Sequence, residues 1–346
     1  MVISGRCDDI GCWVGKLPKG CKLCMEGLKS VVFTTGLCPE NCFYCPISLA
    51  KKGKDVMYVN ETPVRDLKDL LMEVVVSGSK GVGVTGGDPL VKVDDVVKMI
   101  KHLKEFLGDG FHIHLYTTGF LVNDKNLTAL VNAGLDELRI HVTGEHSFKA
   151  LKKALEYPID VGVENPVLPN SLNFLKDVIL KSSELGVKFV NLNELEASES
   201  NYEKFLQRGF KVGVDGVSVE GSKDVALEIL KWVDNAGIDV SVHFCPAVFK
   251  DRYQFRKRLR RRFVRSKRVF EWGKGGLVKW IEVSVDEISN SSLKALWLAD
   301  LAFKAGDKLL TGRRVGSLLK NLKVSYDLVE GYPTTPRKVL NVFQIS

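Results

Sequence analysis

Apolar runs alternate along most of the chain with amphipathic segments, and this alternation predicts strands separated by helices. The predicted strands end in glycine or polar residues and span 30–36, 81–87, 111–119, 135–144, 160–168, 187–196 and 239–245. The segments between them carry apolar residues at helical spacing, as in VDDVVKMIKHLKEFLGDG (93–110), and several end in glycine. The order predicts an α/β protein with a parallel sheet covered by helices.

Six or seven such units fit a partial barrel of the (β/α)6 type. In such barrels the functional groups gather at the C-terminal ends of the strands. The strand ends here read TTG, TGGD, YTTG, HVTG, ENP, NLNELE and HFC. They predict a mouth lined by functional groups, although turns alone also place polar residues after strands.

The pattern changes after residue 250, where a basic segment is followed by predicted strands at 275–285, 324–332 and 338–346 and a predicted helix at 291–306. We therefore expect three parts: a Cys-rich metal-binding segment (1–27), a (β/α) barrel (28–250) and a basic α+β appendage (251–346).

Composition narrows the class of protein. The chain has 346 residues, of which 45% are hydrophobic and 27% charged, as is usual for a folded protein. It has no apolar run of membrane-spanning length and no signal-peptide pattern, so we expect a cytoplasmic protein with no membrane partner. Because the cytosol is reducing, its eight cysteines indicate metal or redox chemistry rather than disulfides.

Three cysteines, Cys38, Cys42 and Cys45, lie in TTGLCPENCFYCPIS, just after the first strand of the β/α series. Thiolates suit zinc, Cu(I) and iron–sulfur clusters, and a structural zinc site needs four ligands. Three thiolates can hold three corners of a [4Fe–4S] cube, which leaves the fourth iron open to a substrate or cofactor. A zinc knuckle or a purely structural cysteine loop is the alternative.

The Cys-x3-Cys-x2-Cys spacing, with Tyr44 directly before the third cysteine, resembles the signature of the radical S-adenosylmethionine (SAM) superfamily. TGGDPL on the second strand is similar to the GGEP element of that family, with Asp88 in place of Glu, which leaves the role of this side chain open. The resemblance covers about residues 28–200. More broadly, the chain resembles archaeal-type proteins related to pyruvate formate-lyase activating enzyme.

The resemblance implies an oxidoreductase with two cofactors, a [4Fe–4S] cluster and SAM. The open iron of the cluster would bind the amino and carboxylate groups of SAM and pass it one electron. The C–S bond then breaks to give methionine and a 5′-deoxyadenosyl radical, which abstracts hydrogen from a substrate. The electron would come from a ferredoxin- or flavodoxin-like one-electron reductant.

This resemblance, and the position of functional groups at the strand ends of such barrels, predict which residues contact the cofactor. They are Tyr44, Gly86, Gly87, Asp88, Thr118, Arg139, Glu164 and Asn193. The two glycines would let backbone groups approach the methionine end of SAM. Tyr44 either lies near the adenine or packs over the cluster. Arg139 and Glu164 are favoured because a charge inside a barrel mouth needs a partner. Each strand-end residue could instead bond a neighbouring loop, and the alternating His112 and His114 are best explained as hydrogen-bonded wall residues.

A second set of cysteines, Cys7, Cys12, Cys21 and Cys24, supplies four ligands within CDDIGCWVGKLPKGCKLC. Four thiols can close a structural zinc site or hold an auxiliary iron–sulfur cluster. Cys245, beside His243, could face the cavity, ligate this N-terminal metal or be an inert buried thiol, and the last is favoured.

Net charge is +8, but the segment 250–268 holds eleven Lys and Arg residues and one Asp, so the rest of the chain is slightly acidic. Within it Phe255, Leu259 and Phe263 recur every four residues and predict a helix with one packed face. Arg256, Arg260 and Arg261 are the candidate substrate contacts, since arginine suits phosphate. RNA, most simply tRNA, is the candidate partner, and a solvated or internally paired helix is the alternative.

Three hypotheses follow. The first is a radical SAM enzyme acting on an unknown substrate, with tRNA as a candidate. The second is an activating or modifying enzyme for a protein or peptide, similar to the activases of glycyl-radical enzymes. The third is a non-enzymatic, metal-stabilised RNA-binding protein.

Overall fold

The computed structural model describes residues 4–7, 11–286, 294, 296–297 and 301–345. The chain forms two compact units, one of Met1–Val74 with Ser79–Phe255 and the other of Val75–Gly78 with Arg256–Ser346.

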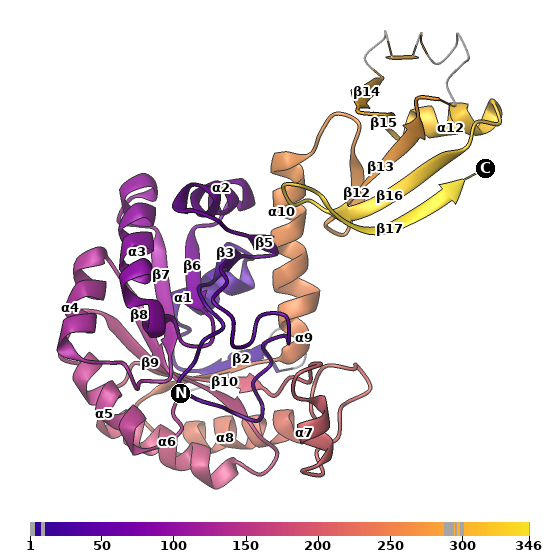
Figure 1. Cartoon of the computed structure of the whole chain (residues 1–346). Helices are drawn as coiled ribbons and strands as arrows, with labels where there is room; N and C mark the ends of the chain where they lie inside the picture. Colours follow the sequence, from indigo (N-terminus) through magenta and orange to yellow (C-terminus); the bar gives the residue numbers. More distant parts are fainter. Residues whose placement is uncertain (1–3, 8–10, 287–293, 295, 298–300, 346) are drawn as a thin grey trace. The chain divides into compact units, whose positions relative to one another are not determined.

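The first unit holds a large sheet and the helices that pack on it (Figure 1). Its strands are β1 (Ser4–Arg6), β2 (Gly11–Val14), β3 (Lys29–Phe33), β4 (Tyr58–Val59), β5 (Thr62–Pro63), β6 (Gly81–Thr85), β7 (His112–Thr117), β8 (Glu137–Ile140), β9 (Asp160–Val167), β10 (Phe189–Glu194) and β11 (Ser241–Cys245). Its helices are α1 (Lys19–Met25), α2 (Leu67–Ser77), η1 (Pro89–Lys92), α3 (Val93–Leu107), α4 (Asp124–Ala133), α5 (Glu145–Ala154), α6 (Leu172–Glu184), α7 (Tyr202–Leu206), α8 (Ser222–Ala236), α9 (Ala247–Phe249) and η2 (Lys250–Phe255).

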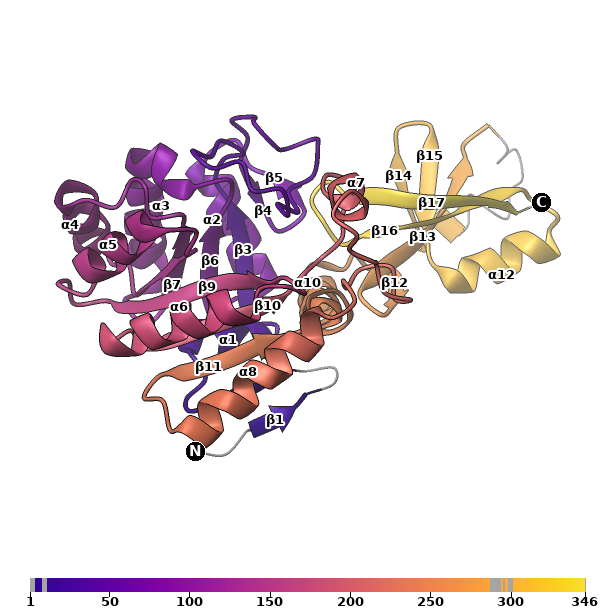
Figure 2. The same cartoon turned by 90° about the horizontal axis from the view of Figure 1, so that it is seen from below.

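The sheet confirms the predicted α/β fold. Its strand order is β1-β2-β11-β10-β9-β8-β7-β6-β3-β4-β5, and β3 and β6 to β11 run parallel. These seven parallel strands are one more than a (β/α)6 barrel requires. Within the described residues the sheet is open, with β1 and β5 at its ends. It is therefore a partial barrel, and α2 to α6 and α8 cover one side of it (Figures 1 and 2).

The helices form where the sequence pattern places them. In α3 the buried side chains are Val96, Met99, Ile100 and Leu103, which recur at helical spacing and pack on the sheet. α4 is capped at its N-terminus by Asn123, whose side chain accepts a hydrogen bond from the Asn126 N–H, and at its C-terminus by Gly134 in the left-handed conformation (φ 100°).

The N-terminal segment does not form a separate knuckle. β1 and β2 form a hairpin that adds to β11 in antiparallel pairing. α1 packs on β3, β6 and β7. A Cβ at Gly20 would lie 2.7 Å from Arg139 Nη2 and 2.8 Å from His114 Nδ1, so this helix is seated deep against the inner face of the sheet. It closes the floor of the partial barrel.

The second unit is α+β. Its elements are α10 (Arg256–Ser266), β12 (Trp272–Lys274), β13 (Leu277–Ser284), β14 (Ala302–Ala305), β15 (Lys308–Thr311), α12 (Arg313–Asn321), β16 (Tyr326–Tyr332) and β17 (Lys338–Ile345). The antiparallel sheet has the order β14-β15-β13-β16-β17, and β12 pairs with β13. The prediction of a helix over 291–306 is wrong at the C-terminal end of this range, where Ala302–Ala305 form β14. Its residues 291–293, 295 and 298–300 lie outside the described residues.

No helix within the described ranges is long and apolar enough to cross a membrane.

Candidate active site

A cavity of about 480 Å³ opens on the inner face of the sheet, a size usual for the binding site of a small molecule. Most of the predicted site residues line it: Cys38, Cys42, Tyr44, Cys45, Gly86, Gly87, Thr118, Arg139, Glu164 and Asn193. Asp88 is the predicted cofactor contact that does not. The side chains at the strand ends therefore meet in one cavity, as predicted for a barrel, because the C-terminal ends of parallel strands lie at the same edge of the sheet.

Backbone hydrogen bonds join the two sequence motifs. Thr34 N–H donates to Thr85 O (2.8 Å), Gly87 N–H to Thr35 O (2.7 Å) and Asp88 N–H to Leu37 O (2.8 Å). A Cβ on Gly87 would collide with the Leu37 carbonyl oxygen and lie 3.0 Å from the Cβ of Cys38. The glycine is therefore needed because the cysteine loop packs directly against the turn after β6, and it leaves backbone, rather than a side chain, facing the cavity.

A second group of contacts holds the other end of the cysteine loop. The Tyr44 hydroxyl hydrogen-bonds His141 Nε2 at 2.9 Å. The Asn201 amide donates to Tyr44 O (3.1 Å), and the Ser200 hydroxyl donates to Cys45 O (3.0 Å). Because both ends of the loop are fixed, the three thiols are presented to the same cavity.

The donor set fits a [4Fe–4S] cluster better than a single ion. No group of three or more His, Cys, Asp or Glu side chains in the described part of the chain could hold a metal ion. In a cubane each thiolate binds a different iron, so its ligands lie further apart than those of one ion. Cys38, Cys42 and Cys45 line one cavity beside a glycine turn, so these three thiols would hold such a cluster at that cavity.

Asp88 lies behind the cavity wall and is fully buried. Its carboxylate accepts hydrogen bonds from Leu90 N–H (3.0 Å), Thr118 N–H (2.9 Å) and the hydroxyls of Thr117 (3.0 Å) and Thr118 (2.6 Å). It caps η1 and ties the turn after β6 to the end of β7. We therefore assign Asp88 a positioning role instead of the direct cofactor contact expected from its motif.

Arg139 is the centre of a buried charge network. Its guanidinium bonds Glu137 (2.5 Å) and Glu164 (2.9 Å). Glu164 also accepts hydrogen bonds from Asn191 (2.7 Å) and Asn193 (2.8 Å). Burial alone would raise the pKa of Glu164, but the Arg139 charge and the two amides outweigh it, so the pKa is lowered. Arg139, Glu164 and Asn193 thus form one preorganised wall.

We expect Arg139→Leu to destabilise the protein by about 3–5 kcal/mol, because it leaves the buried carboxylates of Glu137 and Glu164 without their cation. Anaerobic urea unfolding measures this loss. The double variant Arg139→Leu with Glu137→Leu should recover part of it, since one uncompensated charge is then removed. An unfolding free energy equal to that of the unmodified protein would contradict the network.

Two of the histidines belong to the barrel wall, and two others line the cavity. His112 Nε2 lies 3.4 Å from Glu137 and His114 Nε2 lies 3.2 Å from the Tyr116 hydroxyl. Both are buried, in agreement with wall residues. His141 and His243 line the cavity, and burial lowers the pKa of His243 to about 4, so it is neutral at physiological pH.

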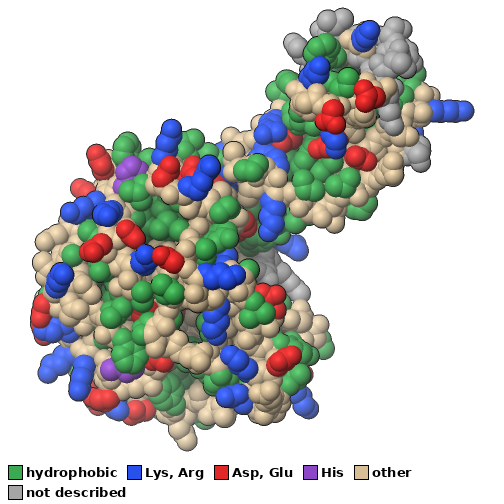
Figure 3. Space-filling model, viewed as in Figure 1, with side chains coloured by type: hydrophobic (Ala, Val, Ile, Leu, Met, Phe, Trp, Pro, Cys, Tyr) green, Lys and Arg blue, Asp and Glu red, His purple; other side chains and the backbone are tan. Residues whose placement is uncertain are grey.

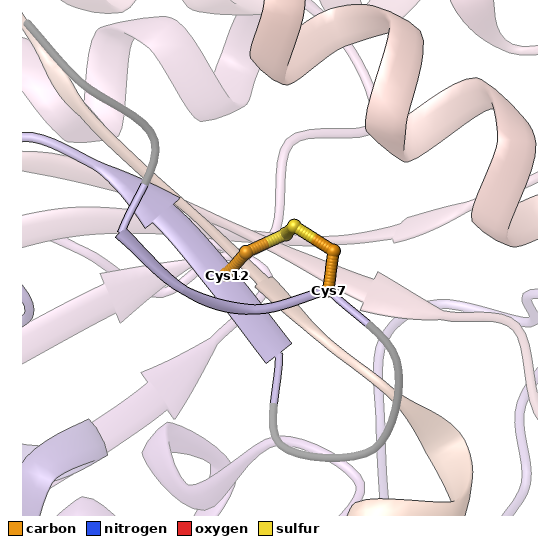
Figure 4. Close-up of a disulfide and its surroundings, with 2 residues drawn as sticks. All are labelled: Cys7 and Cys12. Atoms are coloured by element: carbon orange, nitrogen blue, oxygen red, sulfur yellow. A yellow bond between two sulfur atoms is a disulfide. The ribbon is translucent and has the colours of Figure 1, made fainter.

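The second set of cysteines does not come together, contrary to the predicted four-cysteine metal site. Cys7 and Cys12 form a disulfide (Figure 4), which also corrects the expectation that no cysteines pair. Cys12 belongs to the apolar core, whereas Cys21 and Cys24 on α1 line the cavity. The physical reason is that β2 continues the sheet and α1 enters its inner face, so the two pairs lie on different sides.

Cys245 also lines the cavity, with Cys21 and Cys24, and burial raises the pKa of its thiol. Its position at the end of β11 indicated in the sequence that it could face the cavity. Three residues at the floor of the cavity were not predicted from the sequence: Lys29, Tyr116 and Asn191. A lysine at the start of an apolar strand carries no motif, so only the fold reveals that it faces inward.

The basic segment forms α10, and its arginines are of two kinds. Arg256 and Arg260 are exposed and Arg261 is half-buried, whereas Arg258 and Arg262 are buried. Figure 3 shows basic side chains on the surface where α10 runs in Figure 1. Leu259 is buried and Phe263 packs on the core of the second unit, which confirms the predicted packed face. Part of the basic run is thus structural.

Comparison with known proteins gives the family. The model of the radical SAM superfamily matches residues 32–190. The chain is 44% identical over 260 residues, 70% of this chain and 67% of the relative, to the protein of Methanocaldococcus jannaschii named "Putative glycyl-radical enzyme activating enzyme MJ0021". It is 30% identical over 115 residues, 33% of this chain and 28% of the relative, to the PqqA peptide cyclase of Rhodopseudomonas palustris. The structure of Streptococcus suis SuiB bound to S-adenosylmethionine covers 63% of this chain and 50% of its own, with a TM-score of 0.46 and 10% identity.

The chain belongs to the radical SAM superfamily. It is a radical SAM enzyme that uses a [4Fe–4S] cluster and SAM, and its similarity to MJ0021 confirms the expected relation to activating enzymes. The hypothesis of a non-enzymatic RNA-binding protein is wrong.

Proposed function

We propose that Cys38, Cys42 and Cys45 bind the cluster and that the enzyme abstracts a hydrogen atom from a polypeptide substrate. The observation that carries the first part is the meeting of three thiols and the Gly86–Gly87 turn in one cavity. When bound, cluster and SAM supply a one-electron cleavage of the sulfonium, which yields methionine and a 5′-deoxyadenosyl radical. The electron comes from a one-electron reductant of the ferredoxin or flavodoxin kind.

The residues of the chain orient the cofactor and exclude water. The backbone of Gly86 and Gly87 presents polar groups without side chains, and Asp88 holds that turn in place. Thr118, the Arg139–Glu164 pair and Asn193 are the remaining candidate contacts, supported by their place in the cavity lining. Tyr44 fixes the cysteine loop through His141 and lies where it could also meet the cofactor.

A polypeptide substrate is favoured over tRNA. The relatives are named as an activating enzyme of a glycyl-radical enzyme and as a peptide cyclase, so both names refer to protein or peptide substrates. The RNA hypothesis rests on Arg256, Arg260 and Arg261, and the burial of Arg258 and Arg262 in the same helix gives part of the basic run a structural role. Neither of these two names refers to RNA.

Deuterium transfer tests this proposal. The reconstituted enzyme is incubated with SAM and dithionite, and with either the protein fraction or the RNA fraction of cells grown in deuterated medium. The abstracted atom ends in 5′-deoxyadenosine, so its mass reports the source. We expect deuterium from the protein fraction only.

Transfer from RNA alone would overturn the polypeptide proposal but leave SAM cleavage intact. Absence of 5′-deoxyadenosine in every arm would overturn the radical chemistry. The variant Arg256→Ala with Arg260→Ala serves as a control, because it removes the two exposed arginines among the candidate RNA contacts and should leave transfer from protein unchanged.

A further inference from the structure

The floor of the cavity holds a buried lysine without a partner. Lys29, the first residue of β3, is only 7% exposed and lines the cavity. No hydrogen bond or ion pair joins its ammonium group to any residue that the structure describes. An ammonium group has three N–H donors, and here they are open to an acceptor that enters the cavity.

The neighbouring groups do not meet this need. Two carboxylates that line the cavity are paired with other cations, Glu164 with Arg139 and Glu196 with Lys250. The groups that act most strongly on Lys29 are Cys24 and Tyr116. Burial acts to lower the pKa of Lys29, and the nearby Cys24 and Tyr116 act to raise it.

Lys29 lies far from the proposed cluster ligands. From Lys29 to Phe33 the strand rises by roughly 13 Å, and the loop that holds Cys38 follows only after its end. Cys21 and Cys24 on α1 close the floor beneath it. An occupant that reaches Lys29 therefore extends through the depth of the cavity, away from the glycine turn.

We propose that Lys29, with the neighbouring Tyr116 hydroxyl, binds a carboxylate of the substrate at the floor of the cavity. This inference rests on the proposed function, because it takes the occupant to be a polypeptide. A polypeptide offers this group either at its C-terminus or on an acidic side chain. The contact holds the substrate in place, so Lys29 determines specificity and takes no part in SAM cleavage.

Isothermal titration of the reconstituted enzyme with SAM bound tests the proposal at constant ionic strength. The probes are N-acetylglycine, for a C-terminal carboxylate, and N-acetylglutamic acid α-amide, for a side-chain carboxylate. N-acetylglycinamide and N-acetylglutamine α-amide are their neutral counterparts, and inorganic phosphate is a further probe. We expect at least one carboxylate to bind and its amide not to bind, and the carboxylate that binds identifies the source.

Lys29→Met should weaken that binding at least tenfold. Lys22→Met is the matched control, because Lys22 is exposed on α1, and it should bind as the unmodified enzyme does. If Lys29→Met does not fold, Lys29→Gln takes its place.

The proposal is overturned if no carboxylate binds, if carboxylate and amide bind equally, if phosphate alone binds, or if the Lys29 variant binds normally. Each of these outcomes leaves SAM cleavage, which is measured separately, untouched. Conversely, if the enzyme did not cleave SAM but still bound the carboxylate, the proposed function would be wrong and the carboxylate site would stand.

Discussion

Cys42→Ala abolishes 5′-deoxyadenosine formation, because the cluster then loses one of its three protein ligands. We expect the iron content to fall from about four atoms per chain, the number in a [4Fe–4S] cluster, to near zero. Cys42 lies on a partly exposed loop, so the fold itself should survive the change. Iron analysis, chromatography of the SAM products and circular dichroism measure the three effects.

The matched control is Cys7→Ala. Cys7 pairs with Cys12 away from the cavity, so this variant loses a cysteine but should keep its cluster and its SAM cleavage. SAM cleavage by the Cys42 variant at the normal rate would refute the cluster assignment. Loss of the cluster in both variants would instead show that the N-terminal cysteines also support the metal site.

Asp88→Ala should give the second large effect. The change leaves the buried N–H groups of Leu90 and Thr118 without an acceptor, and each such group costs about 1–3 kcal/mol. We expect a loss of about 2–6 kcal/mol in the free energy of unfolding, measured by anaerobic urea titration. Because Asp88 also holds the glycine turn, the Kd for SAM should rise at least tenfold.

Asp94→Ala is the control for Asp88. Asp94 is an exposed acidic residue in the first turn of α3, where its effect on stability should stay below about 1 kcal/mol and SAM affinity should not change. Asp88→Asn keeps one acceptor oxygen and should fall between the two. Normal SAM affinity in a stable Asp88→Ala variant would show that the carboxylate does not position the turn.

Residues that act through local spacing could be recognised in the sequence. Cys38, Cys42 and Cys45 are close in the chain, and the turn at Gly86 and Gly87 follows a strand, so motif and periodicity together indicated the cavity. The parallel strands were predicted for the same reason, since each is a short apolar run between helices. Because one face of each such element is buried, apolar residues recur at a regular spacing that can be recognised in the sequence.

The tertiary structure decided the features that depend on where a segment goes after it forms. The spacing of Cys7, Cys12, Cys21 and Cys24 predicted one site, but β2 joins the sheet and α1 enters the barrel, so the pairs separate. Likewise, Lys29 reads as a strand start, and only the curvature of the sheet places its ammonium in the cavity. Pairing of β2 with β11 and the seating of α1 are long-range contacts, which local sequence does not encode.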